Sequence, residues 1–391
     1  MPTRLTPNKD ERFMQLALLH ASKALGRTTP NPAVGAVVVK GTRVVATGYH
    51  RRAGKPHAEA EALRAAGSAA QGSTLYVTLE PCCHTGRTGP CTDAVIAAKV
   101  ARVVVGCRDA NPVVNGAGIA RLRRAGIRVD VGCLQDECTA INRAFFCWIE
   151  HQRPLVTLKY AATLDGVIGQ ENAEVGKGRA PLAITSKAAL AYAHGLRAQH
   201  HAILVGHGTV LADDPQLTVR AKRLPPGGSH AILRVVLDTH LRTPPSARLL
   251  AKAEGVPPPL LLAAEPEKAA RAAFARRRRA LEAAGAEVAL VPPGTHGVAL
   301  GPAVRVLAKR GVQSLLVEGG SHVHAAFVAA GLVDRVAAFF APKLAGGGVP
   351  VVTGRGLGTD ALLPLSNLQF TPLGPDLLVT ADVAPAGRRR K

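Results

Sequence analysis

The stretch that decides the fold of the first half of the chain runs from His57 to Cys91. It reads His57-Ala58-Glu59, then the strand-like Thr74-Leu75-Tyr76-Val77-Thr78-Leu79-Glu80, then Pro81-Cys82 and, after a short polar loop, Pro90-Cys91. One imidazole and two thiolates are good Zn²⁺ ligands, and three protein ligands leave a fourth position open for water. A carboxylate two residues from a ligating histidine can move protons for that water without binding the metal. We therefore expect a zinc centre with a catalytic carboxylate, made of His57, Cys82, Cys91 and Glu59.

A closed structural zinc site is the alternative interpretation of this cluster, and buried thiols without metal are another. Structural sites usually have four protein ligands, and His50, Cys83 or His84 offers a fourth. A structural site needs neither a carboxylate beside the histidine nor a proline before each cysteine, so the pattern favours a catalytic metal. Zinc-dependent deaminases carry H-x-E followed by P-C-x-x-C. This chain matches that pattern, except that its two cysteines are nine positions apart.

Composition indicates a globular protein with two domains. The chain has 391 residues, of which 47% are hydrophobic, enough for two separate cores. No apolar run reaches the roughly 18 residues that span a bilayer, and residues 1–10 lack the apolar core of a signal peptide. Seven cysteines, two of them assigned to metal, favour a reducing compartment over a disulfide framework. We expect a cytoplasmic protein that does not associate with membranes.

The net charge of +22 raises the question of a nucleic-acid partner. Basic residues concentrate in Arg276-Arg277-Arg278-Arg279 and in the tail, Arg388-Arg389-Arg390-Lys391, and no base-stacking aromatic accompanies either run. The remaining charge is dispersed. A solvated basic face that attracts an anionic substrate explains this distribution better than nucleic-acid binding.

Hydrophobic periodicity predicts alternating strands and helices in both halves. The first half is therefore expected to form an α/β/α layered domain that ends at the polar stretch 151–154. Its last predicted helix is 137–149, and Cys91 is expected at the start of a helix, where the pKa of a thiol is lowered. In the second half we expect loops at 170–180 and 206–215, and a strand at 314–318 before Gly319-Gly320 and a helix. No G-x-G-x-x-G follows an opening strand, which argues against a Rossmann domain.

The run from Thr78 to Cys91, T-L-E-P-C-C-H-T-G-R-T-G-P-C, resembles the deaminase half of the bifunctional riboflavin-biosynthesis deaminase–reductases. Matching segments upstream are N-P-A-V-G at 31–35, G-Y-H at 48–50 and A-G-K-P-H-A-E at 53–59. The reductase half of the family is similar to L-K-Y-A-A-T-L-D-G at 158–166, T-V-L-A-D-D-P-Q-L-T-V-R at 209–220 and V-E-G-G at 317–320. The resemblance covers about residues 10 to 385.

This resemblance implies a cytidine-deaminase-like α/β/α domain at 1–150, a dihydrofolate-reductase-like α/β domain at 154–385 and a basic tail at 386–391. It implies hydrolytic deamination of a diamino-hydroxy-phosphoribosylaminopyrimidine at one zinc ion per chain. NADPH would then reduce the ribosyl chain to ribityl. The expected partner is this phosphorylated substrate, and a homo-oligomer is possible for the family.

The resemblance also assigns residues of the second half by position. Lys159 and Asp213 would orient the sugar and support proton transfer, although alone they are as readily structural, at a strand end and in a turn. The expected cofactor contacts are Ala161, Ala183, Thr209, Asp213 and Gly320. The expected substrate contacts are Pro181, Arg197, Leu217, Arg220 and Glu318, the two arginines suiting a phosphate.

One departure from the family concerns Ala180-Pro181-Leu182-Ala183, where the family has Glu-Ser-Gln-Trp in contact with cofactor and substrate. It leaves open a deaminase with a degenerate reductase half. A nucleic-acid base deaminase with a basic accessory domain is the second alternative, which steeply salt-dependent polynucleotide binding would favour.

Overall fold

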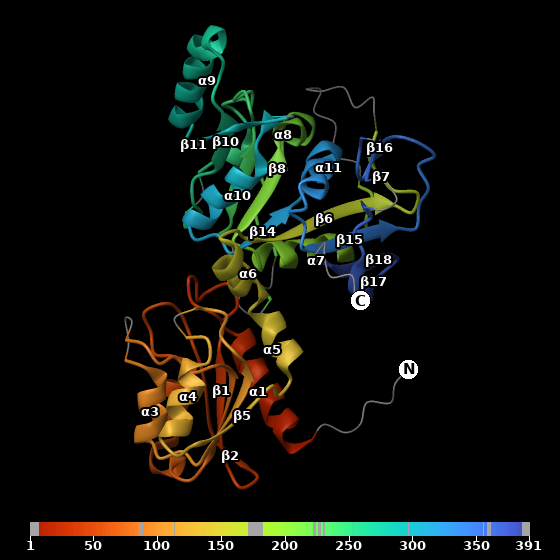
Figure 1. Ribbon diagram of the computed structural model, residues 1–391. Coiled ribbons are helices and arrows are strands. Elements are labelled where there is room, and N and C mark those ends of the chain that lie inside the picture. The colour runs from red at the N-terminus through yellow and green to blue at the C-terminus, as the bar shows by residue number, and fades with distance from the viewer. Residues whose placement is uncertain are drawn as a thin grey trace. The chain divides into compact units, whose positions relative to one another are not determined.

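The computed structural model describes residues 8–384 except 86–88, 113, 171–182, 222–223, 226–227, 230, 253, 296, 355 and 358–360. The predicted loop beyond residue 170, Pro181 and the tail 386–391 lie outside the described residues. Two compact units divide between Gln152 and Arg153 (Figure 1).

The first unit is built on a five-stranded sheet of order β2-β1-β3-β4-β5. β1 runs antiparallel to its neighbours β2 and β3, whereas β3, β4 and β5 are parallel. After their first residue, β3 and β4 are buried throughout, as expected for parallel strands covered on both faces. The strands are β1 Gly35–Lys40, β2 Arg43–Tyr49, β3 Thr74–Leu79, β4 Arg102–Cys107 and β5 Arg128–Val131.

Helices cover both faces of this sheet, which gives the expected α/β/α layers. Gly35 of β1 contacts Ala17 of α1, and Gly106 of β4 contacts Cys138 of α5, so closely that neither position has room for a Cβ. Gly48 of β2 contacts α2 on the opposite face in the same way. α3 and α4 continue the α2 layer. The helices are α1 Lys9–Ser22, α2 Ala58–Ala66, η1 Gly67–Ala70, α3 Cys91–Ala97, α4 Ala117–Arg124, α5 Gln135–Ile141 and α6 Arg143–His151.

The single helix expected at 137–149 is wrong, because α5 and α6 are separated at Asn142. The buried side chain of Asn142 accepts a hydrogen bond from the Ala33 N–H at 2.8 Å and donates one to the Ala33 carbonyl at 2.9 Å. Its backbone, with φ −110° and ψ 11°, leaves the helical region at this position. The amide of Asn142 therefore pairs with the chain just before β1.

A nine-stranded sheet of order β11-β10-β9-β8-β14-β6-β15-β18-β17 forms the second unit. The strands from β11 to β15 are parallel, and β18 and β17 are added antiparallel at one end. The strands are β6 Leu155–Thr163, β8 Ala202–Gly206, β9 Leu233–Leu237, β10 Leu260–Ala264, β11 Glu287–Val291, β14 Ser314–Val317, β15 Arg335–Ala341, β17 Leu365–Leu373 and β18 Asp376–Val383. Two small ribbons pair β7 Val167–Gly169 with β16 Val349–Pro350 and β12 Pro293–Gly294 with β13 Gly297–Val298.

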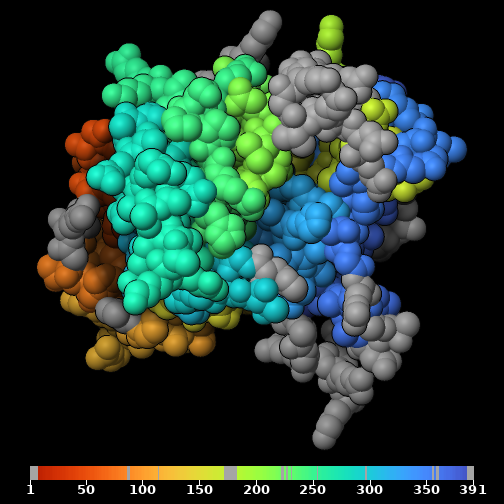
Figure 2. All heavy atoms as spheres, turned by 90° about the horizontal axis from the view of Figure 1, so that it is seen from above, coloured from red at the N-terminus to blue at the C-terminus, as the bar shows by residue number. Residues whose placement is uncertain are grey.

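Helices pack on both faces of the large sheet. α7, α8 and α9 share one face, and α10 and α11 share the other. Figure 2 shows α9, in teal, at the surface of the molecule. The loop expected at 206–215 is largely helix α8, which begins after the extended residue Gly206. The helices are α7 Lys187–Ala198, α8 His207–Asp213, η2 Arg248–Leu250, η3 Lys268–Ala270, α9 Arg271–Ala283, α10 Leu300–Lys309 and α11 Ser321–Ala329.

None of the helices within the described ranges has the length and apolarity required to cross a bilayer.

Candidate active sites

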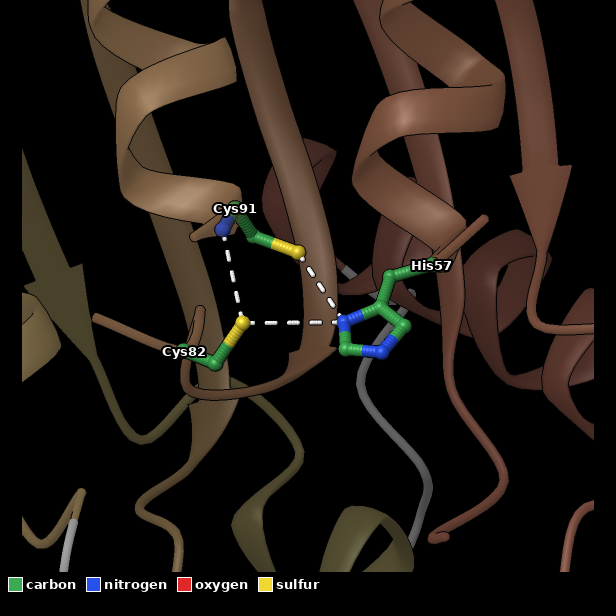
Figure 3. Close-up of side chains that lie close together, drawn as sticks. All are labelled: His57, Cys82 and Cys91. Carbon is green, nitrogen blue, oxygen red and sulfur yellow. Dashed lines mark hydrogen bonds between the residues drawn. The ribbon is translucent and has the colours of Figure 1, made fainter. Parts of the chain in front are cut away.

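Three elements bring the predicted zinc ligands together in the first unit (Figure 3). His57 is the residue before α2, Cys82 follows β3 and Cys91 opens α3. His57 Nδ1 lies 3.1 Å from Cys91 Sγ and 3.6 Å from Cys82 Sγ, and the three ligand atoms lie within 4.8 Å of one another. In the described part of the chain no fourth histidine, cysteine or acid joins this group. The donor set therefore fits Zn²⁺ in an open, catalytic arrangement.

The pKa values of the two thiols are shifted in opposite directions. The Cys91 thiol, more than any other group, lowers the pKa of Cys82 to about 4, and the Cys91 backbone N–H lies 3.3 Å from Cys82 Sγ. The same thiol–thiol contact, together with burial, raises the pKa of Cys91. The expected lowering of the Cys91 pKa by the helix start is outweighed here by this contact and by burial. A bound dication would supply the positive charge that favours the thiolate form of both cysteines.

Glu59 lies in the first turn of α2 and is only 3% exposed. Burial raises the pKa of Glu59 to about 7, although the neighbouring His57 acts in the opposite direction. A carboxyl group with a pKa near neutrality can both accept and donate a proton. Glu59 thus lies beside the three ligands with the properties of an acid–base group.

His50 and Asn31 form a polar pair beside His57; the sequence analysis considered His50 only as a fourth ligand of a structural zinc site and did not consider the Asn31 side chain. His50 Nδ1 lies 3.1 Å from the Pro56 carbonyl, and Nε2 lies 3.1 Å from Asn31 Nδ2. Burial lowers the pKa of His50, so the neutral ring donates from Nδ1 and accepts at Nε2. The His50 and His57 rings meet edge to face with centroids 5.0 Å apart. Both residues belong to the segments 31–35 and 48–50 that carry the family resemblance.

Two buried carboxylates, Glu80 and Asp109, were also missed. Glu80 accepts hydrogen bonds from the N–H groups of Gly116 at 2.9 Å and Ile119 at 3.2 Å, at the start of α4. A carboxylate at this end of a helix is stabilised by the helix dipole. Burial raises the pKa of Asp109 to about 6. The N–H groups that donate to Glu80 lie 29 to 39 residues away in the chain, so sequence spacing carried no signal for it, whereas Asp109 accepts from the N–H of Asn111, two residues further on.

In the second unit, Glu318 joins two of the predicted cations in one buried cluster. Arg197 Nε and Nη2 each donate to a different Glu318 carboxylate oxygen at 2.8 Å, and Lys159 Nζ donates to Oε2 at 3.4 Å. Arg197 Nη1 also donates to the Thr218 carbonyl at 3.2 Å. Burial alone would raise the pKa of Glu318, but Arg197 and Lys159 outweigh it and hold that pKa far below its usual range. The expected substrate residues Arg197 and Glu318 are thus bound to each other and to Lys159.

Thr209 and Gly320 meet where α8 and α11 begin. The Gly320 N–H donates to Thr209 Oγ1 at 3.1 Å, and a Cβ on Gly319 would lie 2.7 Å from Val323. The Ser321 hydroxyl, in the first turn of α11, is buried and has no hydrogen-bond partner among the described residues. Close backbone packing and an unpartnered donor at a helix N-terminus fit the phosphates of a dinucleotide.

The remaining predicted residues have other hydrogen-bond partners or lie in the packed core. Asp213 ends α8, and burial raises its pKa. Leu217 is buried, and Ala161 lies two residues beyond Lys159 on β6. The Arg220 N–H donates to His194 Nδ1 at 3.2 Å, and the Ala183 carbonyl accepts from Lys343 Nζ at 3.3 Å. In the described chain, no hydrogen bond links Asp213 or Ala183 to Lys159, Arg197 or Glu318.

Comparison with known proteins identifies both units. A family model described as the cytidine and deoxycytidylate deaminase zinc-binding region matches residues 7–107, and one described as the RibD C-terminal domain matches residues 154–379. Riboflavin biosynthesis protein RibD of Aquifex aeolicus is 41% identical over 373 residues, covering 95% of this chain and 97% of that protein. The Escherichia coli protein of the same name is 38% identical over 386 residues, covering 94% and 98%.

Solved structures agree over the whole chain. Acinetobacter baumannii RibD gives a TM-score of 0.81 at 34% identity, covering 96% of this chain and 99% of that one. A Thermotoga maritima protein gives 0.78 at 35% identity with the same coverage. That protein is described as a diaminohydroxyphosphoribosylaminopyrimidine deaminase/5-amino-6-(5-phosphoribosylamino)uracil reductase.

The fold and the two sites therefore define a zinc-binding deaminase joined to a reductase that uses a nicotinamide cofactor. This confirms the predicted pair of a cytidine-deaminase-like α/β/α domain and a dihydrofolate-reductase-like α/β domain. The chain belongs to the RibD family of riboflavin biosynthesis proteins, and it is a bifunctional enzyme of that pathway rather than a nucleic-acid base deaminase.

Proposed function

We propose that the first unit deaminates a diamino-hydroxy-phosphoribosylaminopyrimidine and that the second unit then reduces its ribosyl chain to ribityl with NADPH. The observation that carries this proposal is the joint presence of an open three-ligand zinc site and the buried Lys159–Glu318–Arg197 cluster in one chain. The description of the Thermotoga maritima relative supplies the substrate class.

In the deaminase, we infer that His57, Cys82 and Cys91 hold the metal. A bound Zn²⁺ supplies Lewis acidity, which makes water nucleophilic near neutral pH. Glu59 accepts a proton from the attacking water and delivers it to the departing amino group, so that ammonia leaves. The pKa of Glu59, about 7, suits both transfers at neutral pH.

In the reductase, the cofactor contacts are proposed to be Thr209, Gly320 and the start of α11 for the phosphates, and Ala161 and Ala183 beside them. A bound nicotinamide supplies the hydride, and the protein holds the two reacting carbons near contact. Lys159, fixed by Glu318, orients the sugar, and Asp213, with its raised pKa, supports proton transfer. The proposed substrate contacts are Pro181, Arg197, Leu217, Arg220 and Glu318.

The two activities are proposed to reside in separable domains, residues 1–150 and 154–385, with residues 386–391 as a basic tail. Each unit has its own buried core, which supports this division. All seven cysteines are free thiols, which supports a reducing cytoplasm. Self-association of the full chain stays a prediction. Light scattering would test it by measuring the molar mass in solution.

The test uses the full-length, zinc-loaded protein with the aminopyrimidine substrate. We expect ammonia release without NADPH, and loss of the nicotinamide absorbance band once NADPH is added. Ammonia release without any NADPH oxidation would show a degenerate reductase half. Absence of both reactions from a folded, zinc-containing protein would reject the proposal.

A further inference from the structure

The loop that follows β15 is fastened to the turn that follows β6. Asp165, in that turn, accepts hydrogen bonds from the backbone N–H groups of Ala345 at 3.0 Å and Gly346 at 2.8 Å. The Leu164 N–H donates to the Lys343 carbonyl at 2.8 Å. β16, which comes after the loop, pairs with β7, which comes after the turn (Figure 1). The backbone of Lys343 is therefore held in place at the end of β6.

The side chain of Lys343 reaches from this loop to a third part of the chain. Its Nζ donates to the Ile184 carbonyl at 2.7 Å and to the Ala183 carbonyl at 3.3 Å, shortly before α7 begins. Hydrogen bonds from an ammonium group are charge-assisted, and they are stronger than those between neutral groups. Lys343 thus joins the end of β6 to the segment that leads into α7.

These contacts connect the two segments that are proposed to contact the nicotinamide cofactor. Ala161 lies on β6, three residues before Leu164, and Ala183 supplies one of the two carbonyls that Lys343 binds. β6 and β15 are parallel neighbours, so the turn and the loop lie at the carboxyl edge of the sheet, where open α/β sheets bind ligands. Ala183 offers only a methyl side chain, so its contact with a cofactor depends on where its backbone lies.

We propose that Lys343 is a positioning residue of the reductase, which fixes the backbone of Ala183 and Ile184 beside the end of β6 for binding of the nicotinamide cofactor. This inference rests on the proposed function, because it takes the cofactor and its contact at Ala183 from there. Lys343 acts through this segment and not through a contact of its own with the cofactor. Its loss should therefore weaken NADPH and NADH binding equally, whereas a lysine that touched the additional phosphate of NADPH would affect NADPH alone.

Calorimetric binding of NADPH and of NADH to the full-length protein tests this role without turnover. Lys343→Met removes the ammonium group and keeps a side chain of similar length. Both dissociation constants should rise by about tenfold, because charge-assisted hydrogen bonds are lost. Lys343→Arg should recover part of the loss, since a guanidinium group can still donate to the two carbonyls. Lys187→Met, at the exposed first residue of α7, is the matched control and should change neither constant.

Turnover and hydrogen exchange separate positioning from a general loss of structure. Lys343→Met should raise KM for NADPH more than it lowers kcat, and it should leave ammonia release unchanged. In the cofactor-free variant, the backbone amides of residues 183–186 should exchange faster than in wild type, while Lys187→Met should not change their exchange.

Three results would each overturn the inference: unchanged exchange at residues 183–186, a loss confined to NADPH, or NADPH binding by Lys343→Met that equals that of wild type. The last of these would leave the proposed function intact. A folded wild-type protein that neither binds nor oxidises NADPH would reject the proposed function, and this inference with it.

Discussion

The zinc centre and the reductase site are built from the chain in opposite ways. The zinc ligands span 34 residues of the chain. They lie at the ends of three consecutive elements, α2, β3 and α3. The reductase cluster joins Lys159, Arg197 and Glu318 across 159 and 121 residues, from β6, α7 and the end of β14. A local site depends on spacing along the chain, whereas a dispersed site depends on the register of a whole sheet. The same kind of substitution should therefore have different consequences in the two sites.

The largest expected effect is on deamination. Glu59→Gln should lower ammonia release by about 10²- to 10⁴-fold, because the proton acceptor is removed. Zinc content and NADPH oxidation of already deaminated substrate should not change, since the ligands are local and Glu59 is not among them. Rate assays and elemental analysis measure these quantities. Glu61→Gln, on the same helix, is the control. Zinc loss in Glu59→Gln would place Glu59 in the ligand set.

Glu318→Gln should act mainly on the stability of the second unit. It leaves the buried charges of Arg197 and Lys159 without their carboxylate, which costs about 3–5 kcal/mol in the free energy of unfolding. Trp148, the single tryptophan, lies in α6 and reports the first unit by fluorescence, while circular dichroism reports both.

We therefore expect Glu318→Gln to unfold earlier by circular dichroism, while the unfolding transition followed by Trp148 fluorescence does not shift. Glu287→Gln removes the partner of Arg310 in an ion pair with 40% and 48% exposed side chains, and should cost at most about 1 kcal/mol. If both variants lower the free energy of unfolding equally, the buried cluster stabilises the second unit no more than an exposed ion pair does.

Asp213→Asn should slow NADPH oxidation by about 10- to 100-fold, because the amide cannot transfer a proton. The KM for substrate should change little, and ammonia release should be unaffected. Asp214→Asn is the neighbouring control, since its amide oxygen still accepts the Arg248 N–H. A melting temperature lowered without any selective kinetic loss would show that Asp213 is only structural.

The smallest expected effect concerns Asp10, which accepts bonds from Arg102 at 2.7 Å and Tyr76 at 2.7 Å. The Arg102 bond lowers the pKa of Asp10 in the folded state. A carboxyl group whose pKa is lower in the folded state stabilises that state at pH values above its pKa in the unfolded chain, about 4. This contribution is lost as the pH falls through the pKa of the folded state. Asp10→Asn should cost about 1 kcal/mol at pH 7, measured by Trp148 fluorescence in denaturant. The difference from wild type should shrink below pH 4; an unchanged difference there would exclude the charge as its cause.

The sequence indicated the local site more directly than the dispersed one. The residue types and spacing of His57, Glu59, Cys82 and Cys91 carry their chemistry directly. Lys159, Arg197 and Glu318 were assigned only through the family resemblance, because no spacing rule connects Glu318 with Lys159 and Arg197, which precede it by 159 and 121 residues. Helix α8 was missed since Gly206-His207-Gly208 has two helix-breaking residues, yet a Cβ on Gly208 would meet nothing within 4 Å.

The Asn142–Ala33 pair was equally invisible in the sequence. Here one side chain satisfies both backbone groups of a residue 109 positions earlier. Polar groups so far apart in the chain are brought together by packing of the helices, which hydrophobic periodicity does not specify.

That pair also determines where the deaminase can be cut. Ala33 lies two residues from Asn31, and Asn31 holds the ring of His50 against His57. A polypeptide ending before Asn142 would leave the Ala33 backbone without its buried partner. The nearby contact of Asn31 with His50, and of His50 with the zinc ligand His57, would then be less well fixed. We therefore expect that the first unit cannot be shortened to residues 7–107, the segment that the deaminase family model matches, because α5, Asn142 and α6 lie beyond it.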